Sequence, residues 1–236
     1  MDAAPGPRVL AVCGMPFEAA IAQGPRVVTV CGPGPWRVAH RLHALLAMPT
    51  WPHADDGPRW AGIISFGCAG GLDPGLAGGS CVVATGVLAP DGIIAADPDW
   101  TRALLASLPG ARSALLAGVD APLTSAGAKA RLWRDGGAAA ADMESHAAAL
   151  AARRHGIPFA ACRVVLDPAW RGVPACARAA MEVAGAGAPG LALRGLAAAP
   201  TQLGAMCALA RDAWVARRAL RRARARLGAA LGMPAA

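Results

Sequence analysis

The sequence predicts a single α/β domain with a mixed, mainly parallel sheet flanked by helices. Short apolar runs rich in β-branched residues alternate with stretches at helical spacing. Such alternation is typical of buried strands that pair in parallel and are covered by helices on both faces. The chain of 236 residues is long enough for one domain of this kind, over about 8–200. The remaining residues, 201–236, form a basic helical segment that packs on this domain or extends it.

Six apolar runs account for the expected strands. Each is short enough for a strand, and none has the polar alternation of a strand with one solvated face. They therefore indicate strands buried on both faces. The predicted strands are 8–13, 26–31, 61–66, 81–85, 114–118 and 160–166.

Four stretches between these strands have the spacing of helices, namely 35–47, 99–107, 126–133 and 143–155. Asp142 stands where the last of them needs an N-cap, and Gly156 followed by Pro158 supplies its stop. The glycine-rich stretch 67–79 is predicted to be a loop, because six glycines make regular structure unfavourable. Residues 186–199 are apolar and of low complexity, and we expect packed helix and turn there.

Composition excludes several classes of protein. No apolar run reaches the ~18 residues that a spanning helix requires, and the N-terminus lacks the features of a secretory signal. Seven cysteines without paired spacing indicate reduced thiols and a cytoplasmic location. The sequence contains neither a Cys-x-x-Cys pair nor a His-x-x-x-His helix, so no metal site is expected.

Basic residues gather near the C-terminus of a chain whose net charge is +8. A helix over 209–227 would carry Trp214 and Leu220 among seven arginines, at 211, 217, 218, 221, 222, 224 and 226. Such a helix can dock on the domain with a solvated face, or contact the inner face of an anionic membrane peripherally. A purely membrane- or nucleic-acid-binding module is the rival reading. Nucleic acid is the less expected partner, because no recognised motif is present and aromatic residues are few.

Two carboxylates stand 23 positions apart: Glu144 at the start of the fourth helix, and Asp167 at the end of the apolar run that follows it. The chain can return across that helix and bring both to one rim of the sheet, where open α/β folds bind ligands. From local sequence alone, Asp167 could equally cap a following helix. Glu144, like Glu18 near the start of the first helix, could simply compensate a helix dipole.

Several blocks of residues, however, occur in the order of a known family. The segments Asp142-Met-Glu-Ser145, Gly156-Ile-Pro-Phe-Ala160 and Arg163-Val-Val-Leu-Asp167 resemble the second half of the nucleoside phosphorylase and nucleosidase superfamily. Three further blocks match its first half, at 14–18, 31–34 and 65–74. The resemblance covers about residues 8–200 and is strongest to the hopanoid-associated phosphorylase branch.

The resemblance implies cleavage of the N-glycosidic bond of a purine nucleoside. Met143 and Glu144 would hold the ribose, and Asp167 would donate a proton to the leaving base. Glu18 would activate water, as in the hydrolytic branches, or serve the phosphate side. The implied substrate is adenosylhopane, a lipid-linked nucleoside that would release adenine during hopanoid biosynthesis. A nucleosidase for 5′-methylthioadenosine and S-adenosylhomocysteine is the alternative. No cofactor is implied beyond phosphate as a co-substrate, and a homo-oligomer is expected.

The nucleophile stays open between phosphate and water. The turn at Gly32 and Gly34 resembles the family's first glycine turn, which can cradle an anion or order water through backbone N–H groups. Several phosphorylases carry an arginine where this chain has Ser65, which argues against phosphorolysis. The remaining candidates for the anion and base pocket are Gly67, Cys68, Ala69 and Gly70, with Cys68 read as a small buried thiol rather than a nucleophile. For Lys129, contact with the ligand and a place on the surface are both open.

Overall fold

A computed structural model describes residues 8–47, 60–175, 201 and 203–234. The helix and turn expected at 186–199 lie outside these residues. The strands are β1 (Arg8–Cys13), β2 (Val27–Cys31), β3 (Trp60–Gly71), β4 (Cys81–Ala89), β5 (Gly92–Ala95), β6 (Arg112–Gly118), β7 (Ala140–Asp142) and β8 (Phe159–Asp167). The helices are α1 (Pro16–Ala22), α2 (Pro35–Leu46), α3 (Pro98–Ser107), α4 (Ala126–Gly136), α5 (Ser145–His155) and α8 (Leu203–Arg226).

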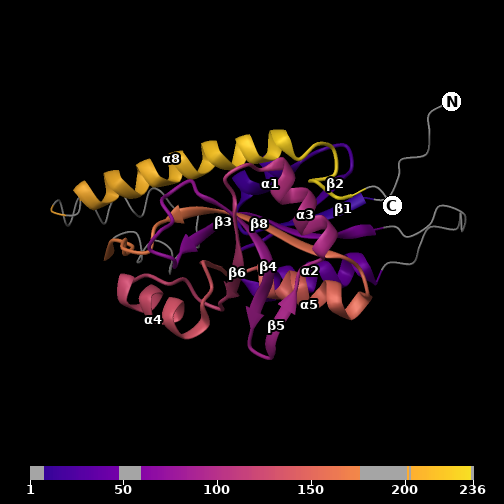
Figure 1. Ribbon diagram of the computed structural model, residues 1–236, viewed down its shortest axis with the longest axis horizontal. Coiled ribbons are helices and arrows are strands. Elements are labelled where there is room, and N and C mark those ends of the chain that lie inside the picture. The colour runs from indigo at the N-terminus through magenta and orange to yellow at the C-terminus, as the bar shows by residue number, and fades with distance from the viewer. Residues whose placement is uncertain (1–7, 48–59, 176–200, 202, 235–236) are drawn as a thin grey trace, which may run out of the picture.

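The eight strands form one mixed sheet, which confirms the predicted fold class (Figure 1). Strands β2, β1, β3 and β8 lie side by side in parallel, and β6 is parallel to both β4 and β7. The pairs β3–β7, β4–β5 and β4–β8 are antiparallel. Because β8 pairs with both β3 and β4, the path through β7 and β6 returns to β3 and the sheet curls closed there.

All six predicted strands are present, but the prediction of a loop at 67–79 was wrong at its beginning. Strand β3 continues to Gly71, because β8 pairs in parallel with residues Ile63 to Gly70 and β7 pairs with Gly70 and Gly71. Glycines weaken an isolated strand, but here each of them pairs with a neighbouring strand: Gly67 with β8, Gly70 with β8 and β7, and Gly71 with β7. Strands β5 and β7 were not predicted.

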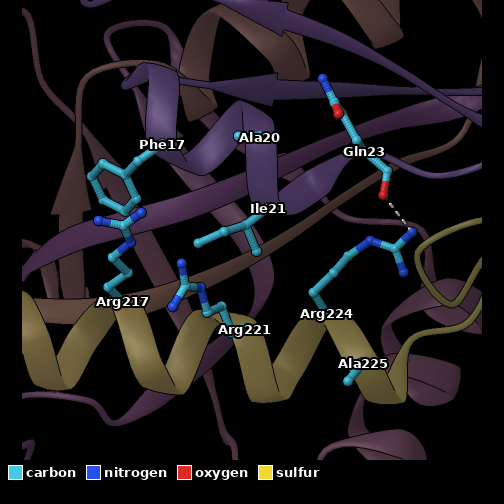
Figure 2. A pocket seen from close by; sticks show the side chains of 8 residues that line it. All are labelled: Phe17, Ala20, Ile21, Gln23, Arg217, Arg221, Arg224 and Ala225. Carbon is cyan, nitrogen blue, oxygen red and sulfur yellow. Dashed lines mark hydrogen bonds between the residues drawn. The ribbon is translucent and has the colours of Figure 1, made fainter.

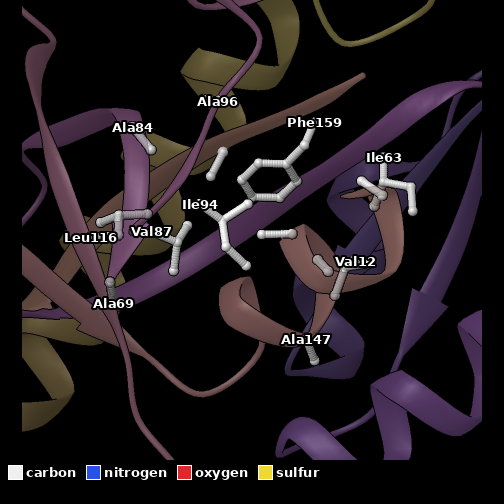
Figure 3. Close-up of a cluster of buried hydrophobic side chains, with 14 of the residues drawn as sticks. Val12, Ile63, Ala69, Ala84, Val87, Ile94, Ala96, Leu116, Ala147 and Phe159 are labelled. Atoms are coloured by element: carbon white, nitrogen blue, oxygen red, sulfur yellow. The ribbon is translucent and has the colours of Figure 1, made fainter. Parts of the chain in front are cut away.

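The helices cover the sheet on two faces. Helices α2 and α5 bury Val38, Leu42 and the alanines of α5 in one cluster with β-strand residues such as Val12, Ile63 and Phe159 (Figure 3). Helices α1, α3 and α8 lie on the other face, where a second cluster contains Trp100 and Leu220 (Figure 1). Helices on both faces are what strands without polar alternation require.

Local signals explain the ends of several helices. The Asp97 carboxylate accepts the N–H of Trp100 at 2.8 Å and begins α3, and the Ser125 hydroxyl begins α4 in the same manner. Gly156, in the left-handed conformation, ends α5 as predicted. The expected start of that helix needs correction: Asp142 is the last residue of β7, and α5 begins at Ser145. The Asp142 carboxylate still accepts N–H groups of the first turn, those of Glu144 and Ser145.

Helix α8 lies along the sheet as its last element. It buries Ala216, Ala219, Leu220 and Ala223, while Trp214 on its outer side is 62% exposed. The Arg224 guanidinium fastens the helix to the end of α1 by donating to the carbonyl oxygens of Ala22 and Gln23. No helix within the described residues is long and apolar enough to cross a membrane.

Candidate active site

A buried arginine lies at the centre of the polar residues of the sheet. Arg163 is in the middle of β8 and has no exposed surface. Its guanidinium is 3.3 Å from the Asp142 carboxylate and 3.4 Å from the Glu144 carboxylate. It also donates to the Ser65 hydroxyl and to the carbonyl oxygen of Cys68. A buried guanidinium needs such anionic and carbonyl partners to offset the loss of hydration.

Glu18 lies beside this arginine, reached from the first turn of α1. Its carboxylate accepts the N–H groups of Gly14 and Met15, both at 2.9 Å, and that of Cys68 at 2.8 Å. Burial raises the pKa of Glu18, while the nearby Arg163 charge and these three N–H donors oppose the rise. The structure thus joins the loop after β1, helix α1 and strand β3 at one carboxylate.

Glu144 and Met143 follow β7 and reach the loops after β1 and β2. The Glu144 carboxylate accepts the N–H of Gly34 at 3.1 Å. Burial raises the Glu144 pKa to about 7, against the lowering effect of Arg163. A methyl group added to Gly34 would lie 3.8 Å from the Met143 Cε atom, so Met143 borders the same turn.

The turn at Gly32 and Gly34 does not present free N–H groups to an anion. The Gly32 N–H donates to the carbonyl oxygen of Cys13 at 3.0 Å, and the Gly34 N–H is taken by Glu144. In this arrangement both N–H groups are bonded to protein acceptors, and the role expected for this turn, cradling an anion or ordering water, stays a prediction.

Glycines in this region let the charged side chains approach the backbone closely. A Cβ atom on Gly67 would lie 2.7 Å from both the Arg163 Nη1 atom and the Glu18 Cδ atom. A Cβ atom on Gly14 would lie 2.9 Å from the Glu144 carboxylate. Cβ atoms do not form contacts this short, so a side chain at Gly67 or Gly14 would force the charged groups packed against it to shift.

Asp167 is the last residue of β8 and stands next to a buried lysine. The Lys129 ammonium, which has no exposed surface, contacts the Asp167 Oδ2 atom directly. Burial raises the pKa of Asp167, and the Lys129 charge opposes that rise. Of the two places considered for Lys129 in the sequence, the surface was wrong, since it lies inside the protein and pairs with a carboxylate; contact with the ligand stays a prediction.

The β3 residues Cys68, Ala69 and Gly70 connect the two polar clusters. A Cβ atom on Gly70 would lie 3.6 Å from the Asp167 Oδ1 atom. Burial raises the pKa of the Cys68 thiol, and the negative charges of Glu18 and Asp167 add to that effect. Cys68 is therefore held as a neutral thiol, and it is buried as expected.

Sequence reasoning missed Arg163, Asp142 and the Lys129 pairing as parts of this site. The signal for Arg163 was visible: a charged residue interrupts an apolar run that is expected to be buried on both faces, so it must have anionic partners. No equivalent signal existed for Lys129, because its partner is 38 positions away and the contact depends on how α4 packs. Within the described residues, no group of three or more His, Cys, Asp or Glu side chains could hold a metal ion.

The fold and this arrangement define the class of protein. It is a mixed α/β protein with buried carboxylates, paired to Arg163 and Lys129, around strands β3 and β8. A family model described as the phosphorylase superfamily matches residues 13–189. The chain therefore belongs to the phosphorylase superfamily. No curated protein matches the sequence significantly.

Solved structures with the same fold include three bacterial enzymes. A 5′-methylthioadenosine/S-adenosylhomocysteine nucleosidase from Colwellia psychrerythraea, in complex with adenine, has 18% identity and a TM-score of 0.64, with 98% of each chain covered. An S-adenosylhomocysteine nucleosidase from Streptococcus pyogenes has 18% identity and a TM-score of 0.60, over 71% of this chain and 86% of that one. The futalosine hydrolase of Helicobacter pylori has 13% identity and a TM-score of 0.57, over 69% and 88%. At such low identity the likeness shows the fold alone.

Proposed function

We propose that this protein cleaves the N-glycosidic bond of a purine nucleoside. The observation that carries the proposal is the arrangement of three buried carboxylates around β3, in a chain of the phosphorylase superfamily. Glu18 and Glu144 flank Arg163, and Asp167 lies farther along β8 beside Lys129. The fold neighbours named above include two nucleosidases and a hydrolase, which agrees with this chemistry.

The proposed mechanism divides the developing charges between the carboxylates. As the C1′–N9 bond breaks, its electron pair leaves with the purine and positive charge grows on the sugar. Asp167 in its acid form gives a proton to the departing base, and the Glu144 carboxylate accepts hydrogen bonds from the ribose hydroxyls with Met143 beside the sugar. A water molecule adds to C1′ and gives its proton to Glu18. Burial raises the pKa values of Glu18 and Asp167 above their ordinary range, which is the direction that favours proton exchange by a carboxyl group.

Water is the nucleophile that the site supports best. A phosphate dianion would need free N–H donors or an unpaired cation. The N–H groups of Gly14, Met15 and Cys68 are bonded to Glu18, and that of Gly34 to Glu144. Arg163 is already paired with two carboxylates, which would also repel a second anion. We therefore propose hydrolysis rather than phosphorolysis.

The substrate that we propose is a 5′-substituted adenosine. Two candidates follow from the sequence and the fold: adenosylhopane, whose 5′ substituent is a lipid, and the thioether nucleosides 5′-methylthioadenosine and S-adenosylhomocysteine. The resemblance of the sequence blocks to the hopanoid-associated branch favours the first. The nucleosidases among the fold neighbours favour the second about equally.

Comparing base release from three separate substrates tests the proposal. Purified protein is given adenosylhopane, 5′-methylthioadenosine or inosine, and the free base is measured by chromatography. We expect adenine from at least one of the first two and little hypoxanthine from inosine. A preference for adenosylhopane would place the enzyme in lipid biosynthesis, whereas a preference for the thioether would indicate salvage. Absence of any base release would overturn the proposed function.

We also propose that α8, together with the groove between α8 and α1, contacts an anionic membrane surface, which would bring the enzyme to a lipid-linked substrate. Figure 2 shows Arg217 and Arg221 extending from α8 toward Phe17 and Ile21 of α1. They line a groove of about 350 Å³ that contains no acidic side chain. Within the described part of the chain neither forms a salt bridge, although Arg217 lies over the Phe17 ring at 5.6 Å. Exposed Trp214 is an aromatic of the kind enriched at lipid interfaces.

Vesicle flotation tests this surface without removing the helix, whose inner side belongs to the protein core. The double variant Arg217→Ala and Arg221→Ala is compared with Arg153→Ala and Arg154→Ala, a matched pair of exposed arginines at the end of α5. We expect the wild type and the α5 variant to float with phosphatidylglycerol vesicles at low salt, and the α8 variant to float less. Equal flotation of all three proteins, or none with any of them, would contradict the membrane contact.

A further inference from the structure

Lys129 has a set of contacts that a surface lysine would not form. It projects from α4 and is fully buried. Besides the Asp167 carboxylate, its ammonium donates to the carbonyl oxygens of Asp167, Pro168 and Arg171, each at 3.1 Å. Four oxygen atoms from one short segment thus surround a single ammonium group. It fastens the turn after β8 to a helix that comes from a different part of the chain.

A lysine is costly to bury, so its position requires an explanation. The carbonyl contacts alone would hold the turn, and a neutral donor could form some of them. The carboxylate contact adds something different, because it places a full positive charge on the residue to which we assign proton delivery. Other charged or titratable groups near Asp167 are the Cys68 thiol on β3 and Asp212 on α8. Asp212 is itself paired with Arg171 at 2.6 Å. The cation that contacts the Asp167 carboxylate directly is Lys129.

We propose that Lys129 is the positioning residue for Asp167: it orients the carboxyl group and stabilises its ionised form after the proton has gone to the base. The proposal rests on the proposed function of Asp167. In the proton-transfer step, the acid form of Asp167 loses its proton to the purine and becomes a carboxylate. That carboxylate then forms a full ion pair with the ammonium. The acid form is restored by a proton from solvent after the products leave.

The consequence is a pH dependence that Lys129 controls. Activity requires the acid form of Asp167, so turnover falls as pH rises through its pKa. Burial raises this pKa and the Lys129 charge lowers it. Removing the charge must raise the pKa further, so the fall in turnover moves to higher pH. An opposite charge at this range lowers a carboxyl pKa by about 1–3 units, and a displacement of about that size is expected.

The test compares the pH profile of kcat for the wild type with those of Lys129→Gln and Lys129→Arg. Glutamine keeps a polar group of similar length without the charge, and arginine keeps the charge with a different shape. In Lys129→Gln, the pH at which kcat falls on the alkaline side of the profile (the alkaline limb) should be higher by at least one unit. We also expect kcat at its plateau to be lower by about tenfold or more. For Lys129→Arg we expect a loss of kcat with the limb unmoved. Arg131→Met, on the exposed side of the same helix, should change neither.

A merely structural lysine would lower kcat in Lys129→Gln without moving the limb, and that result would overturn the proposal. If Lys129→Gln does not fold, a shifted alkaline limb in Lys129→Arg would overturn the proposal as well.

Failure of the proposed function is distinguishable, because it would appear as absence of base release by the wild type at every pH. In that case the Asp167 carboxyl can be titrated by carbon-13 NMR. A pKa of Asp167 that is the same in the wild type and Lys129→Gln would then exclude the electrostatic role.

Discussion

The guanidinium of Arg163 and the carboxylate of Glu144 lie 3.4 Å apart in the interior of the protein. Arg163 is in β8 and Glu144 follows β7, and these two strands pair with opposite sides of β3. The same guanidinium is 3.3 Å from Asp142 and close enough to Glu18 to oppose the rise in its pKa. One cation therefore stabilises three carboxylates that come from α1, β7 and the residue before α5. This relationship links the stability of the fold to the charge state of the proposed active site.

Replacing Arg163 with methionine should destabilise the protein strongly. The variant would leave buried carboxylates without their cation, and removing one partner of a buried ion pair typically costs about 3–5 kcal/mol. The free energy of unfolding, measured with urea, should fall by about this amount. Arg112→Met is the control, since Arg112 is 61% exposed and lies 3.8 Å from Asp73. Its expected effect is about 0–1 kcal/mol. Similar losses in both variants would contradict the central place of Arg163.

The pKa of Glu144 predicts how stability depends on pH. A carboxyl group with a pKa of about 7 in the folded protein, above its ordinary 4.5, binds protons more tightly when folded. Its contribution to stability is complete below about pH 4.5 and is lost as pH rises through 7. Glu144→Gln should remove this dependence, so the difference in unfolding free energy between variant and wild type should change with pH across that range. A difference that is constant between pH 5 and pH 8 would show that the Glu144 pKa is not raised.

Gly67→Ala should disrupt both the site and the fold. The added methyl group would meet Arg163 and Glu18 at 2.7 Å, and overpacking of this kind typically costs about 1–3 kcal/mol. We expect reduced thermal stability together with reduced base release. Gly127→Ala in α4 is the matched control, because nothing lies within 4 Å of its added methyl group. That variant should be neutral or slightly more stable. If the two variants behave alike, the close packing at Gly67 has no consequence.

Asp167→Asn should separate binding from turnover. The amide keeps the size of the side chain but cannot deliver the proton, and general acid catalysis typically contributes about 10²–10⁴-fold. We expect kcat to fall within this range while the affinity for an adenosine analogue changes little. Binding is measured by calorimetry and turnover by base release. Asp99→Asn, an exposed carboxylate paired with Arg102 on α3, should retain full activity. Wild-type turnover by Asp167→Asn would exclude Asp167 as the acid.

The sequence predicted the strands and helices well because their signals are local. Strand β1 was predicted with its observed bounds, and α2 ends one residue earlier than expected. Strand β7 was missed because three residues, Ala-Ala-Asp, carry no period, and they become a strand only between β3 and β6. The extension of β3 through its glycines was missed for the same reason, since pairing with β8 and β7 decides it.

The residues of the candidate site that lie in blocks resembling the family could be named from the sequence. The contacts between side chains that are distant in the sequence could not. The structure places Glu18, Gly67 and Glu144 beside Arg163, with Gly34 bonded to Glu144 and Met143 bordering Gly34. These five were named as site residues from the sequence, whereas Arg163 was not. The pairing of Lys129 with Asp167 and the use of the glycine-turn N–H groups by protein acceptors depend on side-chain packing across the sheet. No pattern of spacing encodes them.

The most direct test of the proposed hydrolysis is the identity of the sugar product. Wild-type protein is incubated with a substrate from which it releases adenine, such as 5′-methylthioadenosine or adenosylhopane, with and without phosphate, and the products are analysed by mass spectrometry. We predict adenine at the same rate in both conditions, together with the free ribose of the substrate. Release that depends on phosphate and yields a ribosyl 1-phosphate would contradict the account of Glu18 and of the occupied N–H groups.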